Sequence, residues 1–198
     1  EACGDVDTMI LDKTGTITYG NRLAAEFYPV KGIAKTDLID YSVMSSLMDT
    51  TPEGKSTVDL GQQMGCGLNE SITDQMSFVE FTAQSKMSGV DLKDGTMVRK
   101  GASQAIQEFV KKQGGKIPED LEEIVTRVSN LGGTPLVVAV NTKIYGVIYL
   151  KDTVKPGLTE RFARLREIGI KTIMCTGDNP LTAATIAKEA GVDGFIAE

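Results

Sequence analysis

Two short apolar runs, at residues 9–11 and 173–175, constrain the fold more than any other feature of the sequence. The first is followed by the stretch DKTG, which begins at Asp12, and the second by TGD, which begins at Thr176. A charged residue directly after a buried strand is costly unless the strand opens onto a ligand crevice at the carboxyl edge of a sheet. We therefore expect Asp12 and Thr176 to lie on the same edge of a parallel sheet.

The residues around these runs predict alternating strands and helices. Strands are expected at 6–11, 135–140, 144–150 and 170–175, with a further strand around 195–196. Leu158, Phe162 and Leu165 lie on one face of a predicted helix, and a second helix runs from Pro180 to Glu189 and ends before Gly191. Strands separated by helices are typical of a parallel sheet with crossover connections.

The middle of the chain has a different pattern. We expect a helix capped by Thr36 that carries Ile39, Val43 and Leu47, and a second helix at 56–64. Antiparallel strands are predicted at 78–82, 87–92 and 97–100, with a hairpin turn at 93–96. Two amphipathic helices follow, one spanning residues 102–110 and one spanning 121–128.

These patterns predict an α/β protein with an insertion. Residues 1–20 and 150–198 would form the two parts of an incomplete Rossmann-like domain, and residues 21–149 an inserted α+β domain built on an antiparallel sheet. Because the sequence starts at Glu1, just before a strand, we interpret it as part of a longer protein.

Composition excludes several functional classes. The chain of 198 residues has a net charge of −6, which argues against bulk binding of nucleic acid or anionic membranes. No apolar run approaches the roughly 18 residues that a membrane-spanning helix needs. The three cysteines, Cys3, Cys66 and Cys175, have no metal-binding spacing, and the absence of histidine removes the commonest general base.

Asp12 is the first candidate for chemistry. A carboxylate at a strand end can attack phosphorus, and the backbone N–H groups of a loop containing Gly15 can hold a phosphoryl group. The alternative is an Asx turn that closes the strand. The Thr176 hydroxyl and nearby N–H groups can bind the same phosphoryl oxygens, beside the N-terminus of the next helix. There the alternative is simple helix capping by Asp178 or Asn179.

The heptapeptide DKTGTIT, residues 12–18, resembles the phosphorylation signature of P-type cation-transporting ATPases, which belong to the haloacid dehalogenase-like superfamily. Thr176-Gly177-Asp178 is similar to the second motif of that superfamily. The resemblance implies that Asp12 accepts a phosphoryl group, and that Asp12 and Thr14 bind Mg²⁺. Related phosphatases carry an acid/base Asp where this chain has Thr14, so a long-lived aspartyl phosphate is implied.

Residues 21–149 resemble the nucleotide-binding domain of the catalytic subunit of potassium-transporting Kdp ATPases, through the stretches TPEGKS, FTAQSKMSG and RKG. The resemblance implies that Phe81 stacks on adenine, that Lys100 lies deep in the pocket, and that Asp49 and Glu53 line it. It also implies that the remaining pocket residues are Thr82, Ala83, Gln84, Ser85, Lys86, Met87 and Ser88. Residue type alone favours a core residue for Phe81, a solvated strand end for Lys100 and a charge in the first turn of a helix for Glu53, and only the motif changes these interpretations.

The implied function is ATP binding and phosphorylation of Asp12 within an ion pump. Its other subunits would be partners in the cell membrane, with these residues in the soluble cytoplasmic part. The resemblance also implies Mg²⁺-binding carboxylates in a segment that the sequence does not contain, so slow turnover is expected. A free-standing phosphatase and a non-catalytic nucleotide-binding module remain alternatives. For Asp152 three roles remain open: a hinge residue, a helix cap, or part of a loop near the nucleotide phosphates, the last of which a loose resemblance to other pumps implies.

Overall fold

The structure is a computed structural model that describes residues 5–197, so Cys3 lies outside the described residues. The described residues form two compact units. The first contains the residues up to Arg22, residues 129–133 and the residues from Lys151 onward. The second contains residues 23–128 and 134–150.

The first unit is built on a parallel sheet with the strand order β1-β8-β9. Its elements are β1 (Thr8–Asp12), α5 (Leu158–Glu167), β8 (Lys171–Thr176), α6 (Pro180–Ala190) and β9 (Gly194–Ala197). In the parallel pair β1–β8, Asp12 lies opposite Cys175, and Thr176 is the next residue of β8. The prediction that Asp12 and Thr176 share one edge of a parallel sheet is confirmed.

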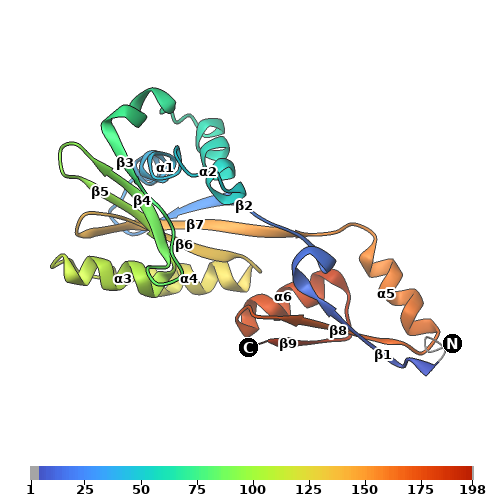
Figure 1. The fold of residues 1–198 in the computed structure, drawn as a ribbon. Helices are drawn as coiled ribbons and strands as arrows, with labels where there is room; N and C mark the ends of the chain where they lie inside the picture. Colours follow the sequence, from blue (N-terminus) through green and yellow to red (C-terminus); the bar gives the residue numbers. More distant parts are fainter. Residues whose placement is uncertain (1–4, 198) are drawn as a thin grey trace. The chain divides into compact units, whose positions relative to one another are not determined.

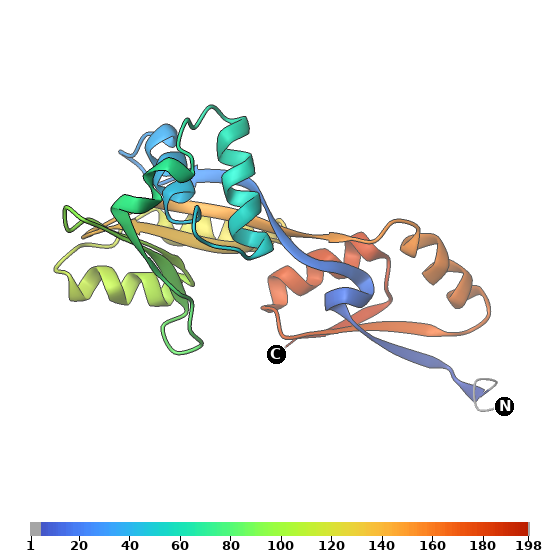
Figure 2. The same cartoon turned by 45° about the horizontal axis from the view of Figure 1, so that its top comes forward.

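Helices α5 and α6 cover one face of this sheet. Phe162 of α5 and Ile186 of α6 pack in one buried cluster with Met174 of β8. Figure 2 shows α6 lying along β8 and β9. Because side chains alternate along a strand, Ile10 points to the opposite face, where it is 64% exposed.

The second unit is built on a six-stranded sheet with the order β2-β7-β6-β5-β4-β3, in which adjacent strands from β7 to β3 pair antiparallel. Its strands are β2 (Thr18–Pro29), β3 (Met76–Val79), β4 (Met87–Leu92), β5 (Met97–Gly101), β6 (Thr134–Val140) and β7 (Lys143–Val154). The sequence patterns did not predict β2, and β7 extends further than its predicted end at Leu150. Both strands contain a boundary between the two units.

Two helices cover each face of the six-stranded sheet (Figure 1). The helices are α1 (Lys35–Met44), α2 (Pro52–Gln63), α3 (Ser103–Lys112) and α4 (Leu121–Asn130). Leu38 and Val43 of α1 pack against Val138 of β6. On the opposite face, residues of α3 and α4 pack against Val137 and Ala139, as the alternation of side chains along β6 requires.

Three local predictions are corrected. Helix α1 begins at Lys35 with Ala34 as its N-cap, so Thr36 lies inside the first turn and does not cap it. Helix α2 begins at Pro52, because the Thr51 hydroxyl accepts a hydrogen bond from the Gly54 N–H and caps it. Strand β3 ends at Val79, which leaves Phe81 and Thr82 in a loop.

The helices of the described chain are too short or too polar to cross a lipid bilayer.

Candidate functional site

Asp12 ends β1 at the start of a tight loop, Lys13–Ile17. Gly15 adopts a left-handed conformation with φ of 79°, which glycine tolerates without strain. Ile17 is fully buried and anchors the loop in the core of the first unit. The Asp12 side chain is exposed and has no side-chain partner among the described residues. A carboxylate held in this way is available as a nucleophile.

Lys13 joins the Asp12 loop to the loop after β8. Its Nζ lies 2.6 Å from Oδ2 of Asp178, and both side chains are largely removed from solvent, with exposed fractions of 4% and 15%. Arg22, which is more exposed, adds a longer contact of 3.8 Å to Oδ1 of Asp178. Asp178 therefore neutralises and positions Lys13.

Thr176 is buried, and its hydroxyl accepts a hydrogen bond of 3.1 Å from the Asp178 N–H. Because a hydroxyl is also a donor, its proton remains available to another oxygen. The next helix, α6, is capped by Asn179, whose side chain accepts from the Thr182 N–H at 3.0 Å. Helix capping thus explains Asn179 and does not explain Asp178. Gly177 is exposed and has open space around it.

Lys155, which follows β7, holds the Asp12 loop, and Asp152, near the end of β7, holds the start of β2. The Lys155 ammonium donates to the Gly15 carbonyl, and the Lys155 N–H donates to the Ile17 carbonyl at 2.9 Å. Asp152 is buried and accepts hydrogen bonds from the Thr18 hydroxyl and from the Gly20 N–H. These contacts place Asp152 in a structural bridge between β2 and β7, and its assignment to a helix cap is wrong.

Oxygen donors for a metal are few at this edge of the sheet. Residues 5–197 contain no group of three or more His, Cys, Asp or Glu side chains placed to hold a metal ion. The available donors are the free Asp12 carboxylate and the carbonyl of Thr14. Mg²⁺ is commonly bound by one or two carboxylates together with water and substrate phosphates, so these two donors fit a shared magnesium site.

In the second unit, Lys100 of β5 is buried and reaches the loop that follows α1. Its Nζ donates to Ser46 Oγ and to Asp49 Oδ2, each at 2.7 Å. This burial excludes the solvated strand end that residue type allowed. An ammonium group has three donors, so one remains for a ligand.

The pKa values of this pair reflect burial and attraction. Burial lowers the pKa of the Lys100 ammonium, and the opposing attraction of Asp49 and Glu53 offsets only part of that effect. Burial by itself raises the pKa of the Asp49 carboxyl, but the charge of Lys100 and the hydrogen bonds from Lys100 and Thr51 outweigh it, so the net pKa lies below its usual value. Attraction therefore favours the ionised carboxylate.

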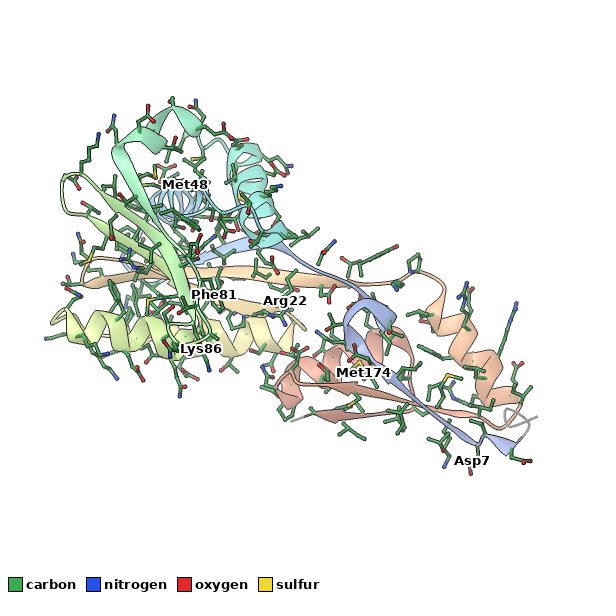
Figure 3. All side chains as sticks on the ribbon, in the orientation of Figure 1. Asp7, Arg22, Met48, Phe81, Lys86 and Met174 are labelled. Carbon is green, nitrogen blue, oxygen red and sulfur yellow. The ribbon has the colours of Figure 1, made fainter. Side chains whose placement is uncertain are left out.

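Phe81 lies in the loop between β3 and β4, where Figure 3 labels it together with Lys86. It is 63% exposed, which excludes a role as a core residue. The loop is held by hydrogen bonds from the Lys86 N–H to the Thr82 carbonyl at 2.8 Å and from the Ser85 N–H to the Thr82 hydroxyl at 3.0 Å. Ala83 and Gln84, between them, are exposed.

Strand register brings the Phe81 loop and Lys100 to the same end of the sheet. Val79 lies opposite Gly89, and Ser88 lies opposite Lys100. Ser88 is buried beside Lys100, and Met87 pairs with Gly101 at the end of β5. Glu53, in the first turn of α2, is half-buried and contributes to the electrostatic environment of Lys100.

The second unit also has a cavity of about 670 Å³ on the side of α1 and α2. Ser46 and Asp49 line it together with Lys55, Gln62 and Glu70. Phe81, Ser88 and Lys100 do not line it. Among the predicted nucleotide contacts the cavity therefore includes only Asp49.

Sequence reasoning missed three residues of these sites. Lys13 and Lys155 fix the Asp12 loop, and Ser46 fixes Lys100. The available signal was the lysine in a short loop directly after an apolar strand, because an ammonium group that becomes buried there requires a partner.

Comparison with known proteins agrees with this geometry. Residues 6–198 match the family described as haloacid dehalogenase-like hydrolase. The chain belongs to this family.

The chain is 71% identical over 198 residues to the potassium-transporting ATPase ATP-binding subunit of Clostridium acetobutylicum. It is 65% identical over 202 aligned residues to the potassium-transporting ATPase ATP-binding subunit 2 of Listeria innocua. Both alignments include the whole chain, which spans 29% of each relative. A crystal structure of a zinc-transporting PIB-type ATPase in the E2.Pi state superposes with a TM-score of 0.67 at 26% identity, over 97% of this chain and 29% of that one. The fold is therefore the haloacid dehalogenase-like α/β fold with an inserted antiparallel sheet.

The Asp49–Lys100 pair generates a pH-dependent prediction. At pH 7, Asp49→Asn leaves a buried ammonium without its counter-charge and should lower the free energy of unfolding by about 3 kcal/mol. Because the pKa of Asp49 is lowered by folding, the stability that it contributes is present at neutral pH and is lost as the pH falls through that lowered pKa. The difference between wild type and variant should therefore shrink below about pH 4.

Urea unfolding at pH 7 and at pH 3 measures this difference. Asp74→Asn, which removes an exposed carboxylate from the same unit, is the control and should change stability by less than about 0.5 kcal/mol. An equal loss for Asp49→Asn at both pH values would show that the ion pair is not its cause.

Proposed function

We propose that this chain is the ATP-binding and phosphorylated region of a P-type potassium-transporting ATPase. The observation that carries the proposal is the shared edge of the β1–β8 sheet, where the unpaired Asp12 carboxylate lies beside the loop of Thr176. The similarity to potassium-transporting ATPase ATP-binding subunits supports the choice of pump class. In this proposal the second unit binds the nucleotide and the first accepts the phosphoryl group.

The reaction is an in-line attack of an Asp12 carboxylate oxygen on the γ-phosphorus of ATP. One phosphorus–oxygen bond forms at Asp12, the bond to the β-phosphate oxygen breaks, and ADP leaves with the electron pair. Backbone N–H groups of the Gly15 loop and the Thr176 hydroxyl would bind the phosphoryl oxygens. Lys13, next to Asp12 in the sequence, is fixed by its ion pair with Asp178 and thereby restrains the loop that carries the attacking carboxylate.

Mg²⁺ would be held by the Asp12 carboxylate and the Thr14 carbonyl together with the ATP phosphates. When bound, it neutralises negative charge on the phosphates. The residues of this chain then orient the nucleophile, because the Lys155 contact to Gly15 and the burial of Ile17 both restrict the loop.

The nucleotide would bind at the end of the six-stranded sheet that carries the Phe81 loop. Phe81 is exposed and would stack on the adenine ring, a contact worth about 1–3 kcal/mol per base. Lys100 would use its third N–H for a phosphate oxygen, while Asp49 and Ser46 fix its position. The remaining pocket contacts come from Glu53, Ser88 and the loop 82–87.

The rest of the pump is a broader proposal. The chain spans less than a third of the relatives that it matches. We propose that the whole protein lies in the cell membrane, that this region is in the cytoplasm, and that the other subunits of a potassium pump are its partners.

Replacement of Phe81 tests the nucleotide site. ATP titrated into the 198-residue chain should shift the backbone amide signals of residues 81–89, and Phe81→Ala should weaken binding by about 1–3 kcal/mol. Tyr19→Ala removes another exposed aromatic side chain, at the start of β2, and should leave the affinity unchanged. No shifts at 81–89, or equal affinity of wild type and Phe81→Ala, would count against this pocket.

Replacement of Asp12 tests the phosphorylation site. In the full-length protein, radiolabel from the γ-phosphate of ATP should remain on the wild-type protein after acid quenching, and Asp12→Asn should abolish the label. Asp7→Asn, just before β1, is the matched control and should keep it. Label that persists on Asp12→Asn would refute the assignment of the nucleophile.

A further inference from the structure

A second cavity in the six-stranded unit has features of an anion site that the proposed function does not use. It has a volume of about 270 Å³ and is lined by three lysines from three separate segments. Lys31 lies between β2 and α1, Lys116 between α3 and α4, and Lys143 begins β7. The lining contains no carboxylate, although the whole chain carries a net charge of −6.

The floor and walls of this cavity are held in place by the fold. Val30 and Ile144, which line it, are buried in the core between the sheet and α3 and α4. The Val30 N–H donates to the Tyr145 carbonyl at 3.0 Å, and the Lys31 N–H donates to the Asp120 carboxylate at 2.8 Å. The three segments therefore present their lysines from fixed backbone positions.

The loop that carries Lys116 packs tightly on the β6–β7 turn. A Cβ atom on Gly115 would lie 2.0 Å from the Thr142 carbonyl oxygen, so only glycine allows this close approach. The same turn leads directly into Lys143. Close packing of these two segments keeps Lys116 and Lys143 on one wall of the cavity.

None of the three lysines forms a salt bridge with a carboxylate of residues 5–197. Asp120, the acidic side chain in contact with this region, is engaged by the backbone N–H of Lys31. Three ammonium groups around one cavity repel one another unless an anion lies between them. The three ammonium groups therefore have no ion-pair partner within residues 5–197, although the Asp120 carboxylate lies close to the backbone of Lys31.

We propose that this cavity binds a compact phosphate anion of two or more charges, such as pyrophosphate or a phosphorylated head group. A volume of about 270 Å³ lies below the roughly 300–1,000 Å³ of pockets for drug-sized ligands, so it suits a phosphate group and not a whole nucleotide. Lysine binds phosphate as a point charge and needs no fixed geometry, which matches three flexible side chains on rigid backbone. The site is separate from Lys100, whose side chain contacts the loop after α1.

Pyrophosphate is the probe for this site. Titrated into the 198-residue chain, it should give saturable shifts of the backbone amides of Lys31, Gly32, Gly115 and Lys143. Each single Lys→Gln change at 31, 116 or 143 should weaken binding about twofold to fivefold, and the triple variant at least about eightfold, since an exposed ion pair contributes up to about 1 kcal/mol. The matched control is the triple variant Lys93→Gln, Lys171→Gln and Lys188→Gln, which removes the same charge elsewhere and should stay within about twofold of wild type.

The outcome is decided by the position of the shifts and by the two triple variants. No saturable shifts at the cavity, shifts confined to residues 81–89, or equal weakening in both triple variants would overturn the proposal. Shifts at 81–89 alone would leave the proposed nucleotide site intact, so the two proposals fail separately. Competition of pyrophosphate binding by phosphatidic acid vesicles, whose phosphate monoester can carry two charges, would identify a lipid head group as the source, and competition by soluble phosphates alone would identify a free anion.

Discussion

The ion pair between Lys13 and Asp178 is the interaction on which the phosphorylation site depends. The two residues follow strands that are neighbours in the sheet and remote in the sequence. A buried ammonium is costly without a counter-charge, and Asp178 supplies it at 2.6 Å. In satisfying Lys13, the chain fixes the loop after Asp12 against the loop after Thr176. The edge of the sheet thereby becomes a site for one phosphoryl group.

The candidate site of the six-stranded unit also contains a buried lysine paired with a carboxylate. Lys100 is buried and is held by Asp49 and Ser46, as Lys13 is held by Asp178. In both cases a carboxylate from a loop of another segment fixes the position of the lysine: Asp178 from the loop after β8, and Asp49 from the loop after α1. The cation is therefore in place before a phosphate binds. The three lysines at 31, 116 and 143 differ, because no carboxylate of the described chain pairs with them. Preorganised cations suit catalysis, and unpaired ones suit reversible binding.

Sequence patterns predicted the helices and strands with clear apolar periodicity. The amphipathic helix α3, the hairpin β4–β5 and the helix after Pro180 are all observed, since local spacing and turn residues determine them. Strand β2 was missed because its sequence, TYGNRLAAEFYP, mixes small, polar and apolar residues, and its extended form depends on pairing with the distant β7. Residue type predicts Thr36 as the cap, whereas the helix follows the turn at Gly32 and begins two residues earlier, with Ala34 as its N-cap.

In the candidate sites, too, local sequence predicted some features, and others depend on contacts between distant segments. The common edge for Asp12 and Thr176 was predictable, because parallel strands with polar carboxyl ends must meet there. The ion-pair partner of Lys13 was not predictable from the sequence. Its identity depends on which strand lies beside β1 and on how deeply each loop is buried. The exposure of Phe81 likewise follows from the end of β3 at Val79.

A double-mutant cycle on Lys13 and Asp178 tests the central claim most directly. Hydrogen exchange of the β1 and β8 amides would give the opening free energy for wild type, Lys13→Met, Asp178→Asn and the double variant. We expect each single change to cost about 2–3 kcal/mol and the double change to cost little more than either one, a coupling of about 2 kcal/mol. If the two losses instead add, the ion pair does not join the two loops, and the account of the site is wrong.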